Sequence, residues 1–283
     1  MKGTILHHPK ASASKKKSPK KIPQFDKYKL YTSSVQSPEA DVDFIMNTYK
    51  GIYEKAPVTL REDFCGTFAL CCEWAKLNEK HKAIGVDIDP EPLNYGRQNY
   101  LANLSQDQQL RVEIREDNVL TNEHVPADVV CALNFSYFAF KKRNILKNYF
   151  QKVYDSLNTD GIFILDCFGG GKCCEANEEE TEYTDMKFSY FWDQHSYDPI
   201  SNHAQFFIHF KRKGEKKRER VFSYDWRMWS LPELKDILAE VGFKNSYVYW
   251  EGNDDEGDGN GIFSKAAVGE ECESWVAYIV SCK

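Results

Sequence analysis

Acidic residues at the ends of two short apolar runs have a spacing that suits ligand binding. The first run ends at Glu62 and Asp63, a turn around Gly66 follows, and the second run ends at Asp87. In open parallel sheets, ligands bind outside the carboxyl ends of the strands. Carboxylates at that position suit a ligand with hydroxyl groups and a cationic group, and they suit a pyrophosphate less well.

The elements that must position these acids follow from the pattern of apolar residues. Runs with strand character alternate with helical segments, which predicts βαβ units and a parallel sheet with helices on both faces. Ser37 and Pro38 mark the start of an earlier helix that ends near Gly51. Strands are expected at residues 58–62, 82–87, 111–115, 127–133 and 161–167, and helices at 68–77, 90–101 and 141–157.

The pattern changes after Asp166, where the insertion begins. Residues 175–185 are acidic and loop-like, and runs with strand composition follow at 188–194, 203–211 and 218–223. A helix at 231–241 stops at Gly242, and two closing strands at 246–250 and 274–281 flank an acidic, glycine-rich loop at 253–261. We therefore predict an α/β fold in one domain, residues 25–283. It has a doubly wound, mostly parallel, seven-stranded sheet and a small antiparallel β insertion at about 170–226 after the fifth strand.

Composition limits the compartment and the partners. Residues 1–24 hold seven lysines and no acid, so this segment is expected to be a disordered basic tail, either solubilising or a nuclear import signal. The whole chain carries −6, which leaves −13 on the remainder and makes nucleic acid an unfavoured partner. The nine cysteines are expected to be free thiols with no metal site. Without a membrane-length apolar run or a secretory signal, we expect a cytoplasmic protein with the nucleus possible and no membrane partner.

Taken in order, these segments resemble the class I S-adenosylmethionine-dependent methyltransferases, from about Phe25 to the C-terminus. Residues 62–68 read Glu-Asp-Phe-Cys-Gly-Thr-Phe and are similar to the family's turn Asp-x-Gly-Cys-Gly-Thr-Gly. The resemblance implies a Rossmann-like fold and S-adenosylmethionine as cofactor, with its methionine part at Glu62 and the turn made by Cys65, Gly66 and Thr67. Phe64 and Phe68 replace two glycines, so both rings must turn aside or reshape the pocket.

Two further segments resemble cofactor-binding motifs of that family. Residues 84–87, Ile-Gly-Val-Asp, are similar to its second strand, so Asp87 is expected to bind both ribose hydroxyls and Ile88 to lie against adenine. Asp89 precedes Pro90 and suits the helix cap better than Asp87 does. The third motif implies that Asp117 meets the adenine amino group, with the backbone of Asn118 and Val119 beside the ring.

The fourth and fifth strands end next to the expected acceptor. The resemblance places the backbone of Asn134 on the cofactor and Tyr137 on the substrate side. Residues 134–137 are faintly similar to the Asn-Pro-Pro-Tyr signature of enzymes that methylate amides or nucleobases, but both prolines are missing. Asp166 faces substrate or holds a loop, and these two interpretations weigh equally. If the acceptor must lose a proton, the candidate bases are Tyr137, Asp166 and His195.

The insertion resembles the part of small-molecule methyltransferases that shapes the substrate pocket. Its aromatic residues line such a pocket or form the core of the inserted sheet: Phe188, Tyr190, Trp192, His195, Trp226 and Trp229. The resemblance implies methyl transfer by in-line displacement to a small molecule or a protein side chain. A non-catalytic methyltransferase-like binding subunit is the alternative, and a nucleic-acid methyltransferase is a minor one. A nicotinamide oxidoreductase is disfavoured because Gly-x-Gly-x-x-Gly is missing. The sequence leaves the acceptor and the oligomeric state open.

Overall fold

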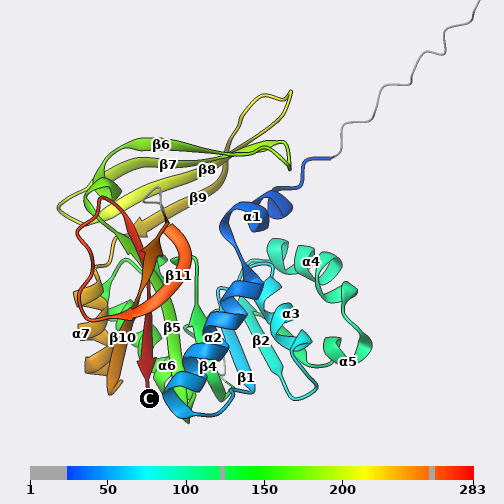
Figure 1. Ribbon diagram of the computed structural model, residues 1–283, viewed down its shortest axis with the longest axis vertical. Coiled ribbons are helices and arrows are strands. Elements are labelled where there is room, and N and C mark those ends of the chain that lie inside the picture. Colours follow the sequence, from blue (N-terminus) through cyan, green and yellow to red (C-terminus); the bar gives the residue numbers. More distant parts are fainter. Residues whose placement is uncertain (1–23, 122–124, 255–258) are drawn as a thin grey trace, which may run out of the picture.

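The computed structural model describes residues 24–121, 125–254 and 259–283, and the predicted basic tail lies almost wholly outside them. The described chain forms an eight-stranded sheet with helices on both faces (Figure 1). A separate four-stranded sheet lies across the carboxyl ends of the parallel strands. Among the described helices, none has the length and apolar character needed to cross a lipid bilayer.

The large sheet has the strand order β11-β10-β12-β5-β4-β1-β2-β3. The strands β1 to β5 run parallel, whereas β12 is antiparallel to both β5 and β10. Its strands are β1 (Thr59–Asp63), β2 (Lys82–Asp87), β3 (Val112–Glu116), β4 (Ala127–Ala132), β5 (Leu157–Gly169), β10 (Asn245–Asn253), β11 (Gly259–Ala266) and β12 (Trp275–Cys282). The predicted doubly wound α/β fold is confirmed.

One strand more than the predicted seven belongs to this sheet. The segment 253–261 was expected to be a loop, but β11 begins at Gly259 and pairs antiparallel with β10 at the sheet edge. The pairing runs from Val248 opposite Ala266 to Asn253 opposite Gly259, with a register shift between Glu251 and Asn253. An edge strand gains its hydrogen bonds from one neighbour, so local composition gives little sign of it.

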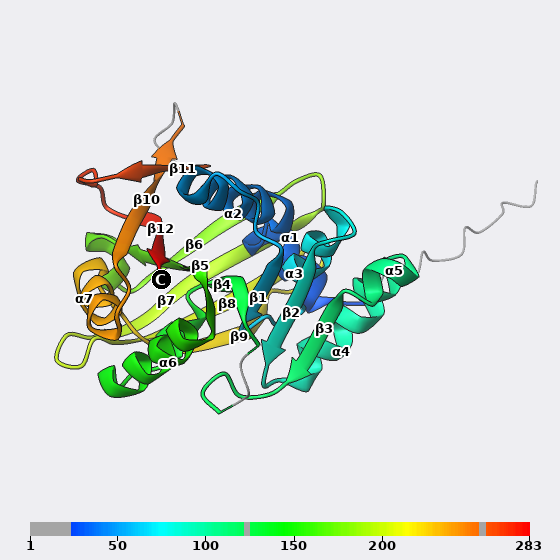
Figure 2. The same cartoon turned by 90° about the horizontal axis from the view of Figure 1, so that it is seen from below.

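Helices cover both faces of the large sheet. Val129 and Cys131 of β4 face one core cluster, and Val130 and Ala132 face the other, because successive strand residues point to opposite sides. The first cluster holds α2 (Pro38–Tyr53), α3 (Ala69–Lys76) and α4 (Pro90–Asn99), and the second holds α6 (Arg143–Ser156) and α7 (Leu231–Val241). Figure 2 shows α2 and α6 on opposite sides of the strands. The shorter helices are η1 (Leu101–Asn103), α5 (Gln106–Gln109), η2 (Ser136–Ala139) and η3 (Gly171–Cys174).

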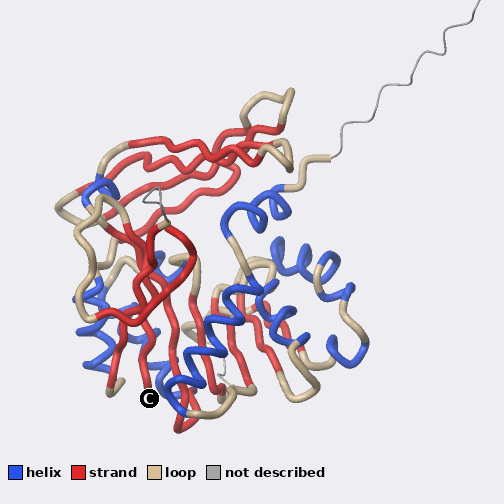
Figure 3. Tube along the Cα trace, viewed as in Figure 1, coloured by secondary structure: helices blue, strands red, loops and turns tan. Residues whose placement is uncertain are grey.

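The inserted sheet contains four antiparallel strands in the order β6-β7-β8-β9. Figure 3 shows it as a separate group of strands above the large sheet. They are β6 (Asn177–Tyr183), β7 (Phe188–Asp198), β8 (His203–Arg212) and β9 (Arg218–Arg227). The acidic segment expected to be a loop is therefore β6, which pairs with β7 along its whole length. Lys217 Nζ lies 2.5 Å from Glu178 Oε2 and offsets part of this negative charge.

The lead-in that the sequence left without a helix forms α1 (Lys27–Val35). Asp26 caps it by accepting the Lys29 N–H at 2.9 Å. Tyr28 packs against Tyr95 of α4 at a ring distance of 4.9 Å and against Phe222 of β9 at 6.0 Å. This helix therefore connects the large sheet's helix layer to the inserted sheet.

Candidate functional site

The two acids at the end of β1 point to opposite faces of the sheet. Glu62 is buried, and Cys71 Sγ of α3 donates a hydrogen bond to its Oε2 at 3.2 Å. Burial raises the pKa of Glu62 to about 8, and the nearby carboxylates of Asp41 and Asp87 add to the rise. Asp63 instead accepts a hydrogen bond from Arg61 Nε at 3.0 Å, so its charge is neutralised within the core. Only Glu62 remains for a ligand.

The turn after β1 has left-handed backbone at Phe64, Gly66 and Phe68, with φ of 59°, 52° and 48°. The Phe64 ring packs edge-on against Phe140 and Tyr149, each at 5.6 Å. It is thus turned aside into the core of the α6 face.

Phe68 is fully buried, and its ring packs against Gly96 of α4. A Cβ on Gly96 would lie 2.5 Å from that ring and 2.2 Å from the Thr67 carbonyl oxygen. The absence of a side chain at Gly96 therefore makes room for the Phe68 ring. Thr67 Oγ1 is buried with no hydrogen-bond partner among the described groups, and the Cys65 thiol is buried against Gly85.

Asp87 ends β2 directly beside this turn. Its Oδ2 accepts the Gly66 N–H at 2.7 Å, and its Oδ1 accepts the Asp89 N–H at 2.9 Å. Asp89 caps α4 by accepting the Glu91 N–H, as the sequence predicts. A carboxylate offers about four acceptor sites, so Asp87 retains about two for a ligand. Burial raises its pKa, and Ile88 next to it is exposed for 67% of its area.

The third predicted segment lies against the same strand end. The Asp117 N–H donates to the Asp87 carbonyl oxygen at 2.9 Å, which brings Asp117 beside Ile88. Asp117 Oδ1 accepts the Asn118 N–H, and Asn118 Oδ1 accepts the Leu120 N–H, so the two side chains fold this turn. Val119 is buried. The structure thus gathers the predicted residues of β1, β2 and β3 at one end of the sheet.

Asp166 holds the turn after β4 and also borders a cavity. Its two oxygens accept the N–H groups of Asn134 at 2.6 Å and Phe135 at 2.8 Å, both residues in left-handed conformation. The Asn134 amide is therefore used within the protein, and only its carbonyl or side chain can contact a cofactor. Burial raises the pKa of Asp166 to about 7.

Asp41 of α2 belongs to the same site, and the sequence analysis missed it. It lines a cavity of about 670 Å³ together with Asn134 and Asp166. Tyr278 of β12 donates a hydrogen bond to its Oδ1 at 3.0 Å, and burial raises its pKa to about 6. Asp41 precedes the buried Ile45 by one helical turn. An acid on the apolar stripe of a helix is the signal that could have found it.

A second cavity, of about 210 Å³, is lined mostly by aromatic residues and lies between the two sheets. It shares Val35, Asn134, Phe135 and Val276 with the acidic cavity. Its ring-bearing walls are Tyr31, Phe135, Phe168, Tyr190, Trp192, Tyr224 and Trp226.

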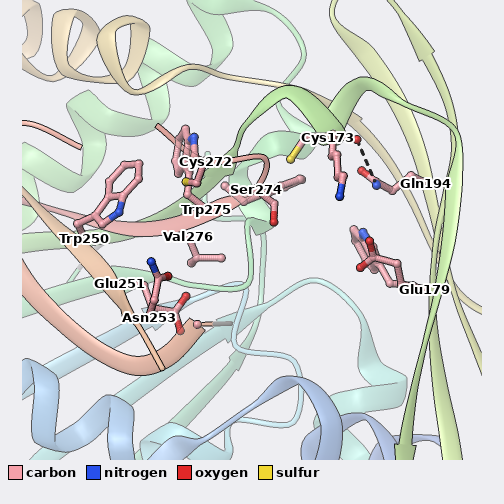
Figure 4. Close-up of a pocket in the computed structure, with 14 residues that line it drawn as sticks. Cys173, Glu179, Gln194, Trp250, Glu251, Asn253, Cys272, Ser274, Trp275 and Val276 are labelled. Atoms are coloured by element: carbon pink, nitrogen blue, oxygen red, sulfur yellow. Dashed lines mark hydrogen bonds between the residues drawn. The ribbon is translucent and has the colours of Figure 1, made fainter. Parts of the chain in front are cut away.

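A third cavity, of about 300 Å³, adjoins the aromatic one at Phe168 and Trp192. Its walls are more polar, with Glu179, Glu251 and Asn253 lying around it (Figure 4). In the same view Gln194 Nε2 donates to the main-chain carbonyl of Lys172 at 3.4 Å.

Other predicted pocket residues lie elsewhere. The prediction that His195 is a candidate base is not supported, because its side chain is 46% exposed and contacts Asp193 and Phe207 on the far face of the inserted sheet. Successive residues of a strand point to opposite faces, so His195 lies on the face opposite to that of Trp192 and Gln194. Tyr137 is fully buried and donates to the Asp166 carbonyl oxygen at 2.6 Å, and its pKa is raised well above the usual value, so it is a core residue.

Phe188 and Trp229, which the sequence assigns either to the pocket or to the core, are core residues. Trp229 is buried in the α6–α7 cluster, and Phe188 packs within the inserted sheet. Tyr190, Trp192 and Trp226 do line the aromatic cavity.

One group in the described part of the chain has the spacing of metal ligands: Glu178, Asp193 and His209. The Arg220 N–H donates to His209 Nδ1 at 2.7 Å, so the ring proton sits on Nε2 and points toward Asp193 Oδ2 at 3.2 Å. A nitrogen that carries a proton has no lone pair for a metal. This group is therefore a hydrogen-bonded cluster, and it lies on the same outer face as His195.

Comparisons of the structure identify the fold. An S-adenosylmethionine-dependent methyltransferase from Clostridium acetobutylicum ATCC 824 matches with a TM-score of 0.65 at 16% identity, covering 89% of this chain and 96% of that one. CalS10, an amino pentose methyltransferase from Micromonospora echinaspora, matches with 0.61 at 12%, covering 92% and 99%. The sugar N-methyltransferase KedS8 from Streptoalloteichus sp ATCC 53650 matches with 0.59 at 13%, covering 97% and 99%.

No protein-family model matches this sequence, and no curated protein matches it by sequence comparison. The structural matches extend over nearly the whole length of both partners. The chain therefore has the class I fold of the S-adenosylmethionine-dependent methyltransferases, and the resemblance drawn from its motifs is confirmed at the level of the fold.

Proposed function

We propose that the protein is an S-adenosylmethionine-dependent methyltransferase. The observation that carries the proposal is a cluster of buried and half-buried carboxylates at the ligand end of the sheet. Burial raises the pKa of Asp41, Glu62, Asp87 and Asp166, and neighbouring carboxylates reinforce the rise for Glu62 and Asp166. None of the ion pairs among the described residues includes any of these four.

Such a cluster suits a ligand that brings positive charge. S-adenosylmethionine carries a sulfonium and an ammonium group, so it would supply the cations that the carboxylates lack. When bound, it supplies a methyl group attached to positively charged sulfur. The buried, unpaired Thr67 Oγ1 and the exposed Ile88 support the same ligand, since one offers a hydrogen bond and the other an apolar surface beside Asp87.

Different residues of the site would bind different parts of the cofactor. Asp87, with two acceptor sites left, would bind the ribose hydroxyls, and Ile88 with the turn at Asp117 would hold the adenine ring. Glu62 and Asp41 would face the methionine part. Phe64 and Phe68 leave the turn clear because both rings pack into the core. This removes the main support for a non-catalytic binding subunit.

The remaining task is to orient the acceptor. In-line displacement needs the acceptor atom, the methyl carbon and the sulfur on one line, and proximity and orientation supply most of the catalysis. The aromatic cavity shares Asn134 and Phe135 with the acidic cavity, which suits an acceptor held directly beside the cofactor. A small molecule fits its volume of about 210 Å³ better than a folded partner does.

Calorimetric titration with S-adenosylmethionine and S-adenosylhomocysteine tests the proposal. We expect micromolar binding by the wild type. Asp87→Ala should weaken it by about tenfold to a hundredfold, because a charged hydrogen-bond partner contributes about 1.5–3 kcal/mol.

Asp89→Ala is the matched control, since it removes a neighbouring acid of the same type that only caps α4. It should lower stability by about 1 kcal/mol and leave the affinity nearly unchanged. A folded wild-type protein that binds neither compound would refute the proposed function.

A further inference from the structure

The aromatic cavity has the composition of a site for positively charged nitrogen. Seven of its eleven lining residues carry aromatic rings, and none is lysine, arginine or histidine. Trp192, Tyr224 and Trp226 form one wall, with ring distances of 4.4 Å between Tyr224 and Trp226 and 6.1 Å between Trp192 and Tyr224. Aromatic faces attract a cation placed within about 6 Å of their centres.

The adjoining acidic cavity favours the same charge. Its lining also contains no basic side chain, but it includes Asp41, Asp43, Asp166 and Glu251. Asn134 and Phe135, the two residues whose N–H groups Asp166 accepts, line both cavities. A cation in the aromatic cavity therefore has rings around it and carboxylates next to it. An anionic acceptor would meet only repulsion there.

We propose that the acceptor is an aliphatic amine, whose nitrogen lies among Trp192, Tyr224 and Trp226 and leaves the site as a methylated ammonium ion. This inference rests on the proposed methyltransferase function and names its substrate class.

The chemistry balances with a sulfonium methyl donor. The amine binds as an ammonium ion and loses one proton, which Asp166 in the lining of the adjoining acidic cavity can accept and pass to water. The nitrogen lone pair then forms the N–C bond while the C–S bond breaks, and that electron pair stays on sulfur. Positive charge moves from sulfur to nitrogen, into the ring of aromatic faces that stabilises it.

The fold places these rings through the inserted sheet. Trp192 stacks on Phe206 at 5.0 Å, and Phe206 packs against Trp226 at 5.5 Å. The buried Phe206 ring therefore holds both tryptophan rings of this wall in place. Tyr31 of α1 also lines the cavity, and its ring packs against Phe222 of β9 at 4.9 Å. The rings are thus ordered before an acceptor arrives.

The test compares two ligands of the same shape that differ in charge. They are choline and its uncharged carbon isostere, 3,3-dimethylbutan-1-ol. Each is titrated into protein saturated with S-adenosylhomocysteine, and binding is followed by ligand-observed NMR. We expect choline to bind about five- to thirtyfold more tightly than the isostere. Trp192→Leu should remove most of this preference, and Trp192→Phe should keep part of it because a ring remains.

Phe207→Leu is the control, because Phe207 lies on the outer face of the same sheet beside His209. It should leave the preference for choline unchanged. Equal binding of the two ligands by the wild type, or no binding of either while S-adenosylhomocysteine binds, would overturn the amine inference and leave the proposed function standing. Failure of S-adenosylhomocysteine itself to bind would refute both. The wild-type comparison remains decisive even if Trp192→Leu does not fold.

Discussion

Asp87 Oδ2 accepts the Gly66 N–H at 2.7 Å, which fastens the turn after the first strand to the end of the second. The two residues are 21 positions apart, and β1 and β2 lie side by side in parallel. A backbone hydrogen bond of this kind fixes the carboxylate's orientation before any ligand arrives. The turn and the acid therefore act as one binding unit, and several measurable consequences come from the packing around it.

The ion pair of Arg61 and Asp63 should dominate the local stability. Both side chains are almost completely buried, and the Tyr149 hydroxyl also donates to Asp63 Oδ2 at 2.9 Å. Asp63→Ala leaves the Arg61 charge unpaired, so we expect a loss of about 3–5 kcal/mol in the free energy of unfolding. Urea denaturation measures it. Lys55→Ala breaks the exposed pair with Asp160 and should cost less than about 1 kcal/mol; equal losses would refute this prediction.

Replacing Phe68 with glycine, the residue that the similar family has at this position of the turn, should lower the stability of the protein. The substitution Phe68→Gly relieves a left-handed backbone, worth about 1–2 kcal/mol, but it removes a fully buried ring worth about 3–5 kcal/mol. We expect a net destabilisation of about 2–3 kcal/mol in thermal or chemical denaturation. A more stable variant would show that backbone strain outweighs core packing at this turn.

Gly96→Ala should damage the same turn from the other side. Its added Cβ would meet the Thr67 carbonyl oxygen at 2.2 Å, and a backbone atom cannot rotate away. We expect a loss of about 1–3 kcal/mol in stability and weaker cofactor binding, measured by denaturation and calorimetry. Gly51→Ala, a helix position with open space around it, is the control and should stabilise α2 by up to about 1 kcal/mol. Unchanged binding by Gly96→Ala would contradict the prediction.

The stability of the ligand-free protein should fall as the pH rises. In the folded state the pKa is about 6 for Asp41, about 7 for Asp166 and about 8 for Glu62, above the usual values near 4. The folded protein therefore holds protons that the unfolded chain has released, and this stabilisation is full below pH 4 and lost as the pH rises through 6 to 8. Thermal melts between pH 5 and 9 should show the decline. S-adenosylhomocysteine should reduce it, because its ammonium favours charged carboxylates.

Glu62→Gln separates the two roles of that carboxyl group. Glutamine has almost the same shape and carries no charge, so the variant should be more stable than the wild type at pH 9 by about 1–2 kcal/mol. The same change should weaken S-adenosylmethionine binding about tenfold, since a charged partner is lost. The two measurements move in opposite directions. A variant that is less stable at pH 9 would show that Glu62 already has a cationic partner.

Substitutions of the two candidate bases, Asp166 and His195, should differ clearly in their effect on the rate of methyl transfer. Asp166→Asn loses one of the two backbone hydrogen bonds to Asn134 and Phe135 and removes the proton acceptor, so we expect methyl transfer to an amine to fall at least about a hundredfold. His195→Ala should change the rate by less than about twofold, because the ring lies on the outer face of the inserted sheet. A larger effect at His195 than at Asp166 would contradict the site described above. The rate is measured by mass spectrometry of the methylated product.

The sequence by itself determined the order of elements and the acids at the ends of β1 and β2. Both come from local signals: apolar runs of strand length, helix starts such as Ser37-Pro38 and Asp89-Pro90, and a turn motif within seven residues. Such signals need no knowledge of what lies across the fold. The strands β6 and β11 were missed because an acidic or glycine-rich segment becomes a strand only when a neighbour pairs with it.

The tertiary structure alone decided which side chains meet. Asp41 joins Asp166 and Glu62 because α2 packs over the sheet, although 125 residues separate the first two. The packing of the inserted sheet over the large one decides that Trp192 of β7 lines the cavity while His195 lies on the outer face. Phe64 and Phe68 avoid the ligand turn only because the α6 core and Gly96 receive their rings. The surroundings of a side chain and the depth of its burial depend on contacts between distant segments. The periodicity of a sequence reports only on residues that are close together in the chain.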